Sequence, residues 1–313
     1  MTVPLRAVDG VDVTIVIDNY IDVLMAGAEG VHRYLVQDLA DRDQLIAEHG
    51  FSALVTVRSG NDRSSILYDA GLTPTALARN LAVLDVPVKE LRAIVISHGH
   101  ADHHGGLEGL FRRHGVSRLP LVIHPEAWRE RKVVFPTGTE LLLPPPGRGD
   151  LEREDVQLIE ERSETLLLDD SIMVSGQVER VTPFEKGFPI HFAASNGGWE
   201  PDPMIWDDQN VIVNVRGKGL VIVSGCSHAG AVNVVRNAQR LTGETRIAGF
   251  VGGMHLTGGL FETIIDDTVE ALAAAHVGRL LPAHCSGWKA VHALARRMPD
   301  AFVQPAVGTV VSF

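Results

Sequence analysis

Residues 94–107 read Ile-Val-Ile-Ser-His-Gly-His-Ala-Asp-His-His-Gly-Gly-Leu. This apolar run of strand length stops abruptly in polar residues, as a buried strand does when it delivers side chains to the rim of a sheet. His98 and His100 are two residues apart, so both can point to one side of the extended chain end. Asp102 and His103 fall where a following helix would begin. The spacing therefore predicts two imidazoles for one cation, and an imidazole with a carboxylate for a second cation beside it.

This His-x-His-x-Asp-His pattern resembles the signature of the metallo-β-lactamase superfamily of binuclear metal hydrolases. The resemblance implies that the first two histidines, His98 and His100, bind one metal ion. Asp102 and His103 then bind the other. It also implies an α/β (α+β) fold, a four-layer αββα sandwich, formed by residues 1–313 as a single domain. The alternative is a solvated histidine-rich loop, but the leading strand and the two trailing glycines agree with a metal site.

Length, composition and charge indicate which kinds of partner the protein has and where in the cell it is found. The chain has 313 residues, enough to bury a large core, and a net charge of −11 from 28 Lys plus Arg and 39 Asp plus Glu. This acidic balance, with no run of Lys or Arg, argues against nucleic acid as a partner and leaves a small-molecule substrate. The N-terminus lacks the build of a signal peptide, and no stretch has about 18 uninterrupted apolar residues. We therefore expect a cytoplasmic protein without a membrane partner, and its oligomeric state is left open.

Hydrophobic periodicity and turn residues predict the order of the elements. We expect strands at 11–19, 52–58 and 64–69, a helix from 73 to about 85, the ligand-bearing strand at 91–97, a helix at 106–114, and strands at 119–123 and 165–176. Residues 31–49 carry apolar residues at helix-like intervals, which predicts a further helix. That helix would be either a solvated surface segment or a lid over the site.

The segment from about 178 to 208 is long, irregular and rich in aromatic residues, glycine and proline. A structureless loop of this length in a compact protein is usually functional or disordered, and large aromatic side chains argue against disorder. We therefore predict an inserted loop that covers the substrate, with a merely packed excursion as the alternative. The predicted substrate-binding residues are Phe184, His191, Trp199 and Trp206. Of these, His191 is expected to line the site and not to bind metal.

Three later strand ends repeat the arrangement of an apolar strand followed by ligand-type residues. After strands at 220–224, 246–251 and 277–281 come Gly-Cys226-Ser-His228, Gly-Gly-Met-His255 and Pro-Ala-His284-Cys285. His228, His255 and His284 thus become candidate metal ligands. The only two cysteines of the chain each lie beside a histidine-bearing motif, which suits a metal site better than a structural disulfide.

Motifs along nearly the whole chain resemble one branch of the superfamily, named after the dihydropterin ribofuranosyl-aminobenzene phosphate synthase of methanopterin biosynthesis. They are Asp18-Asn19, Glu48-His49-Gly50, Ser97-His98-Gly99-His100, Asp207-Asp208-Gln209, Gly225-Cys226-Ser227-His228, Gly252-Gly253 with His255-Leu256, and His284-Cys285 with Gly287. Two residues depart from the branch, because Ala101 and His104 stand where Tyr and Thr are expected. His284 matches the last histidine ligand of the superfamily best, and His255 is the residue that such a site needs least.

Two positions have roles that depend on the resemblance. Asp69 ends its strand where the superfamily has an aspartate that orients the histidine loop through hydrogen bonds without binding metal. Cys226 stands at the strand end that normally supplies a bridging aspartate. A thiolate there could bridge or bind an ion such as zinc. In the alternative, Cys226 is a buried neutral thiol and His228 does the binding.

The resemblance implies a hydrolase with two divalent metal ions, zinc in the first place and iron or manganese as alternatives. A metal-bound hydroxide would attack a small ester, lactone, amide or phosphate compound. Asp102 would hold a metal and also accept the proton of the attacking water, which makes it the predicted catalytic residue. Two other functions stay open: a pterin-type condensing enzyme that releases pyrophosphate, and a non-catalytic metal-bearing protein that binds a ligand.

Overall fold

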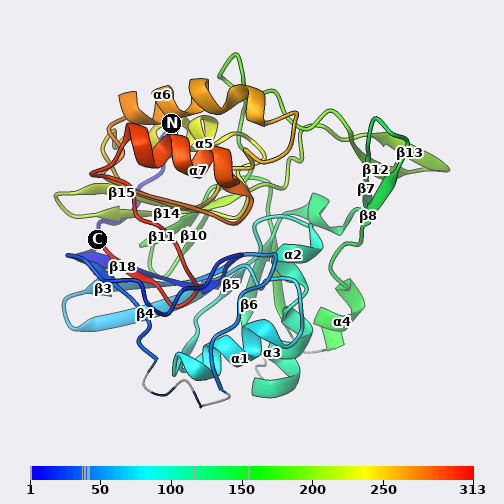
Figure 1. Ribbon diagram of the computed structural model, residues 1–313. Coiled ribbons are helices and arrows are strands. Elements are labelled where there is room, and N and C mark those ends of the chain that lie inside the picture. The colour runs from blue at the N-terminus through cyan, green and yellow to red at the C-terminus, as the bar shows by residue number, and fades with distance from the viewer. Residues whose placement is uncertain (1, 37, 39, 41–42, 116–117, 154–155) are drawn as a thin grey trace.

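Two β-sheets lie face to face, and helices cover the outer side of each (Figure 1). The structure is a computed structural model that describes residues 2–36, 38, 40, 43–115, 118–153 and 156–313. The helices over one sheet are α5 (Ala231–Thr242), α6 (Ile265–Ala274) and α7 (Trp288–Arg297), and those over the other include α1 (Ala76–Val83) and α3 (Leu107–His114). The predicted four-layer αββα sandwich of the α/β (α+β) class is confirmed.

The strand order places two sets of parallel strands against each other. The eight-stranded sheet runs β2 (Val31–His32), β18 (Val310–Ser312), β1 (Gly10–Ile17), β3 (Ser52–Ser59), β4 (Asp62–Tyr68), β5 (Ile94–Val95), β6 (Pro120–Ile123) and β9 (Gln157–Glu160). The six-stranded sheet runs β10 (Thr165–Leu167), β11 (Ile172–Val174), β14 (Asn210–Val215), β15 (Gly219–Ser224), β16 (Ile247–Gly253) and β17 (Arg279–Ala283). Within them β4-β5-β6 and β15-β16-β17 are parallel. Because the carboxyl ends of parallel strands meet at one edge, the loops that follow these strands gather there.

The central strands are apolar on both faces because each sheet is covered on both sides. In β15, Val221 and Val223 pack between the two sheets, whereas Leu220 and Ile222 pack under the helices. This alternation follows from the period of two along a strand. Strands buried on both faces therefore read as continuous apolar runs, which is why the sequence locates them so well.

A smaller, four-stranded sheet projects from the sandwich (Figure 1). It consists of β13 (Gly198–Pro201), β12 (His191–Ser195), β7 (Arg131–Val134) and β8 (Glu140–Leu143). β12 and β13 lie inside the segment predicted as an irregular loop, so that prediction is wrong for these residues. The turn between them is Asn196-Gly197, with Gly197 at φ 91°, and Asn-Gly is a favoured turn for two-residue hairpins. β12 then pairs with β7, which joins this hairpin to the β7–β8 hairpin in one sheet.

Two further predicted elements differ from the structure. The helix expected over 31–49 is wrong for the described residues, while residues 37, 39, 41 and 42 lie outside them. Val31 and His32 instead extend the sheet edge by pairing with β18, and Leu35 is 73% exposed, so the apolar spacing does not mark one helix face. The ligand-bearing strand is also shorter than expected: it spans Ile94–Val95, and a 3-10 turn at Val88–Glu90 precedes it in the chain. Among the described residues, no helix has the length and apolar character needed to span a membrane.

Candidate metal centre

Three buried imidazole nitrogens converge at the strand-end edge of the sandwich. His98 Nε2 lies 3.0 Å from His100 Nδ1 and 3.2 Å from His228 Nε2. Ligands of a tetrahedral zinc ion, with Zn–N bonds of about 2.0–2.1 Å, lie about 3.3 Å from one another. His98 and His100 follow β5, and His228 follows β15, so the parallel strand ends of the two sheets bring the three rings together. Their spacing fits a single divalent ion.

A hydrogen-bond chain fixes which nitrogen of His98 carries the lone pair. The carboxylate of Asp69 accepts hydrogen bonds from the Ser97 amide at 2.7 Å and from the Ser97 hydroxyl at 2.8 Å. Because that hydroxyl donates its only proton to Asp69, its oxygen must accept from His98 Nδ1, 2.8 Å away. Burial, followed by the neighbouring histidines, lowers the pKa of His98 well below its usual range, so the ring is neutral. The lone pair of His98 therefore lies on Nε2, where the three nitrogens meet.

His100 is fixed in the same way by a residue of the projecting sheet. The carbonyl oxygen of Asp202 can only accept, so His191 Nδ1 donates to it at 2.9 Å. Burial lowers the pKa of His191 to about 4, and the neutral ring therefore presents a lone pair on Nε2. His100 Nε2 lies 3.0 Å from that atom and must be the donor. The lone pair of His100 is left on Nδ1, facing His98. His191 thus lies against a candidate ligand.

Replacing His191 by alanine is expected to weaken metal binding about 10–100-fold, the range for residues that orient metal ligands. Without the acceptor on His191, His100 loses the hydrogen bond that selects its tautomer and ring orientation. Competition with a chromophoric chelator measures the affinity. His32→Ala, which removes an exposed histidine on β2, is the matched control and should bind metal as the unmodified protein does. An unchanged affinity for His191→Ala would show that the His100 tautomer does not depend on this contact.

A second group of ligand atoms surrounds the carboxylate of Asp102. Its Oδ2 lies 3.2 Å from His284 Nε2, 3.4 Å from His49 Nε2 and 3.8 Å from His103 Nε2. His103 Nδ1 donates to Asp69 Oδ2 at 2.7 Å, which directs its Nε2 into the cluster. Burial raises the pKa of Asp102, but His103 and His284 outweigh it and hold that pKa well below its usual range. Asp102 is therefore a carboxylate that can bind a cation.

Several buried nitrogens of the candidate ligands, in both groups and in His255, lack hydrogen-bond partners among the described residues. They are Nδ1 of His228, Nδ1 of His255 and Nε2 of His284. Leaving such atoms unpaired costs free energy unless something else binds them. His284 Nε2 is the informative case, because it lies 3.2 Å from Asp102 Oδ2, an ion-pair contact that a cation between the two atoms would replace. Residues of this chemistry and placement fit a divalent metal ion.

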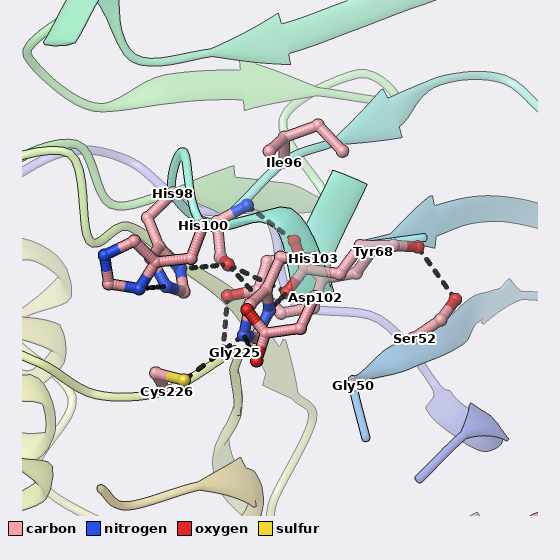
Figure 2. Close-up of polar contacts among 12 residues, drawn as sticks. Gly50, Ser52, Tyr68, Ile96, His98, His100, Asp102, His103, Gly225 and Cys226 are labelled. Carbon is pink, nitrogen blue, oxygen red and sulfur yellow. Dashed lines mark hydrogen bonds and ion pairs between the residues drawn. The ribbon is translucent and has the colours of Figure 1, made fainter. Parts of the chain in front are cut away.

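Cys226 lies between the two groups of ligand atoms. Its sulfur is 3.2 Å from His103 Nε2, and Figure 2 shows it beside the histidines of the strand-end loop. The Cys226 sulfur also lies within 4.8 Å of His98 and His228 on one side and of His284 on the other. Burial raises the pKa of the Cys226 thiol well above its usual range. A cation at either side would counteract this, since metal ions favour the thiolate.

An ion-pair network that the sequence analysis missed supports the loop between His98 and His100. The side chain of Arg131 is fully buried and donates to both carboxylate oxygens of Asp207, at 2.7 and 2.6 Å, and through Nε to Asp202 at 3.0 Å. Asp207 also accepts from the backbone amide of Gly99 at 2.8 Å. Asp207 belongs to a motif noted in the sequence. The residues around Arg131, however, form no pattern that predicts Arg131 as the partner of Asp207.

Two cavities lie beside the candidate ligands, and only some of the predicted substrate-binding residues are near them. A cavity of about 370 Å³ beside His228 and His255 is lined by Phe184 and by other apolar side chains. A second, of about 680 Å³, opens beside His284 on the opposite side. Neither Trp199 nor Trp206 is among the described residues that line them. Trp199 is 39% exposed and packs against Lys132, while Trp206 packs against Arg180. The structure thus brings Phe184 and His191, but not the two tryptophans, to the histidines.

Known proteins resemble this chain in sequence and in fold. Residues 47–176 match the metallo-beta-lactamase superfamily. A 7,8-dihydropterin-6-methyl-4-(beta-D-ribofuranosyl)-aminobenzene-5'-phosphate synthase from Methanocaldococcus jannaschii is 29% identical over 277 residues, covering 85% of this chain and 90% of that protein. An uncharacterized protein of the same organism is 28% identical, covering 86% of this chain and 94% of that protein. The crystal structure of a metal-dependent hydrolase of the beta-lactamase superfamily shares the fold, with a TM-score of 0.72 and 23% identity over 97% of this chain and 98% of that one.

Proposed function

Because this chain belongs to the metallo-β-lactamase superfamily, we propose that it is a hydrolase that depends on two divalent metal ions and acts on a small ester, lactone, amide or phosphate compound. The observation that carries the proposal is the convergence of two ligand groups on either side of Cys226. One group is His98, His100 and His228, and the other is Asp102, His103 and His284.

The candidate ligands and their neighbours would have different roles in catalysis. Bound divalent ions would supply Lewis acidity and would lower the pKa of a water at the centre toward neutrality. Asp102 is a carboxylate at neutral pH and borders the second group, so it can both hold a metal ion and accept the proton of that water. Imidazole and thiolate donors favour zinc, with iron or manganese as the alternatives. Asp69 would orient His98 and His103 without binding metal itself.

The cavity beside His228 supports a small substrate with an apolar part. Its lining includes Phe184, Met254, Leu256 and Phe261, which can pack against a ring or a short chain. We propose that the segment 178–208 covers this side of the centre, because it supplies both Phe184 in the cavity wall and His191 against His100. The net charge of −11 supports a small molecule over nucleic acid.

A condensing enzyme is the second candidate, and the synthase from Methanocaldococcus jannaschii is the observation that favours it. Its likeness covers 85% of this chain. In such a reaction the same ligand groups would hold metal ions against a pyrophosphate leaving group, and the cavity would hold a flat heterocycle. The two candidates therefore share a centre and differ in the compound that reaches it.

One set of assays separates the candidates. The protein is freed of metal with a chelator, reloaded with zinc or manganese, and tested on chromogenic esters, lactones, β-lactams and phosphodiesters. We expect turnover on at least one of these, lost on chelation and restored by metal. Pyrophosphate release from a dihydropterin diphosphate and an aminobenzene acceptor, without hydrolysis of any test compound, would favour the synthase. No turnover in either assay, together with tight binding of a ligand, would contradict both and identify a binding protein.

A further inference from the structure

Two buried thiols touch at the back of the candidate centre, and the proposed function uses only one of them. Cys226 follows β15 and Cys285 follows β17, and their side chains are almost inaccessible to solvent. The two sulfur atoms lie 3.2 Å apart. Within the described residues both are free cysteines. β16 runs between the two strands, and its last residue, Gly253, leaves room for the Cys285 sulfur, because a β-carbon there would lie 2.7 Å from it.

Three relationships between the thiols can be considered, and the sulfur separation excludes one of them. A disulfide would require about 2.05 Å, so the sulfurs are not bonded. Two thiolates on one tetrahedral zinc ion lie about 3.8 Å apart, given Zn–S bonds of about 2.3 Å. The observed 3.2 Å approaches that separation, and small side-chain rotations would reach it. The third relationship is a pair of neutral thiols that merely pack in the core.

The neighbours of the thiols argue for metal binding over mere packing. The ligand atoms of Cys226, His284 and Cys285 all lie within 4.8 Å of one another, and all three residues are buried. His284 Nε2 has no hydrogen-bond partner among the described residues. That nitrogen faces the Asp102 carboxylate 3.2 Å away, and a cation bound by the imidazole and the two sulfurs would satisfy all three ligand atoms.

We propose that Cys285 is a metal ligand and that Cys226, His284 and Cys285 form a sulfur-rich subsite of the centre. This inference rests on the proposed function, because His284 belongs to the second ligand group. Thiolates bind soft and borderline ions, so the subsite favours zinc, cobalt or cadmium over manganese. The subsite would give the centre two unlike positions, one ligated by imidazoles alone and one with sulfur.

Divalent cobalt shows directly whether thiolates bind the metal ion. Thiolate ligands give cobalt an intense near-ultraviolet charge-transfer absorption, and imidazole and carboxylate ligands do not. Metal-free protein is titrated with cobalt alone, and the spectrum is compared for the unmodified chain, Cys226→Ser, Cys285→Ser and the double variant. We expect the absorption in the unmodified chain, about half of it in each single variant and none in the double variant. Met173→Leu, which changes a buried sulfur on β11 that is not a thiol, is the matched control and should keep the full absorption.

The outcomes separate this inference from the proposed function. An absorption that is lost in Cys226→Ser but unchanged in Cys285→Ser would overturn the assignment of Cys285. Bound cobalt without any thiolate absorption would overturn the subsite and leave the imidazole group standing. Failure of the chain to bind cobalt at all would overturn both proposals. If a variant fails to fold, X-ray absorption at the zinc edge of the unmodified protein decides, since the inference requires a zinc–sulfur shell at about 2.3 Å.

Discussion

Replacing Asp102 by alanine is expected to remove one of the two bound metal ions and to lower turnover by about 10²–10⁴-fold, the range for a positioned proton acceptor. The carboxylate of Asp102 is the only acidic group that the described residues place in the second ligand group, within 3.2 Å of His284 Nε2. Its loss would leave His103 and His284 without the negative charge that balances a divalent ion. Metal content per chain and steady-state rates measure the two effects.

Asp102→Asn separates the two roles of this residue. The amide keeps an oxygen donor but cannot accept a proton in the way a carboxylate does, so metal should be partly retained while turnover is lost. Asp300→Ala, which removes an exposed carboxylate, is the control and should leave both quantities unchanged. Activity that survives Asp102→Ala would show that the centre is assigned to the wrong residues.

Replacing Arg131 by alanine is expected to lower the free energy of unfolding by about 3–5 kcal/mol, the cost of breaking a buried ion pair from one side. Its guanidinium is fully buried and is the partner of Asp202 and Asp207. Burial lowers the pKa of Arg131, but the two carboxylates outweigh burial and raise it, so the pair is charged in the folded state. Two carboxylates without a cation would then remain in the interior. Urea unfolding followed by circular dichroism measures the change.

The same substitution should also weaken metal binding, because Asp207 accepts a hydrogen bond from Gly99 between His98 and His100. Arg131→Lys keeps the charge but not the fork that reaches both oxygens of Asp207, so its effect should be smaller but clear. Arg297→Ala breaks an exposed pair with Glu270 and should leave stability nearly unchanged. A loss below about 1 kcal/mol for Arg131→Ala would mean that the buried pair contributes no more than an exposed one does.

The fold could be predicted from sequence wherever strands are buried on both faces. The run Leu220–Val223, for example, is continuously apolar and is followed by Ser224 and Gly225, so the sequence predicts both that it is a strand and where it ends. The segment 31–49 was harder, because Val31 is buried by pairing at a sheet edge while Leu35 is exposed. The β12–β13 hairpin carried a usable signal in Asn196-Gly197, but its aromatic and irregular surroundings obscured it.

The candidate site was predictable where ligands lie within a few residues of each other or follow strand ends. Each residue predicted as a ligand falls in at least one group of ligand atoms within 4.8 Å. Apart from Asp69, whose role the family resemblance implied, the partners that hold the ligands were not predictable, because those contacts join distant parts of the chain. His191 lies 91 residues from His100, and Arg131 lies 76 residues from Asp207. Such pairings are decided by packing, and no local period or spacing encodes them.

The metal content of the purified protein tests the central claim most directly. Elemental analysis of chain prepared without chelator, and of metal-free chain after reloading with zinc, gives the number of bound ions. Two separate ligand groups on either side of Cys226 predict about two metal ions per chain, and about one in Asp102→Ala. A content well below about one ion per chain after reloading would contradict the account of this cluster as a binuclear metal centre.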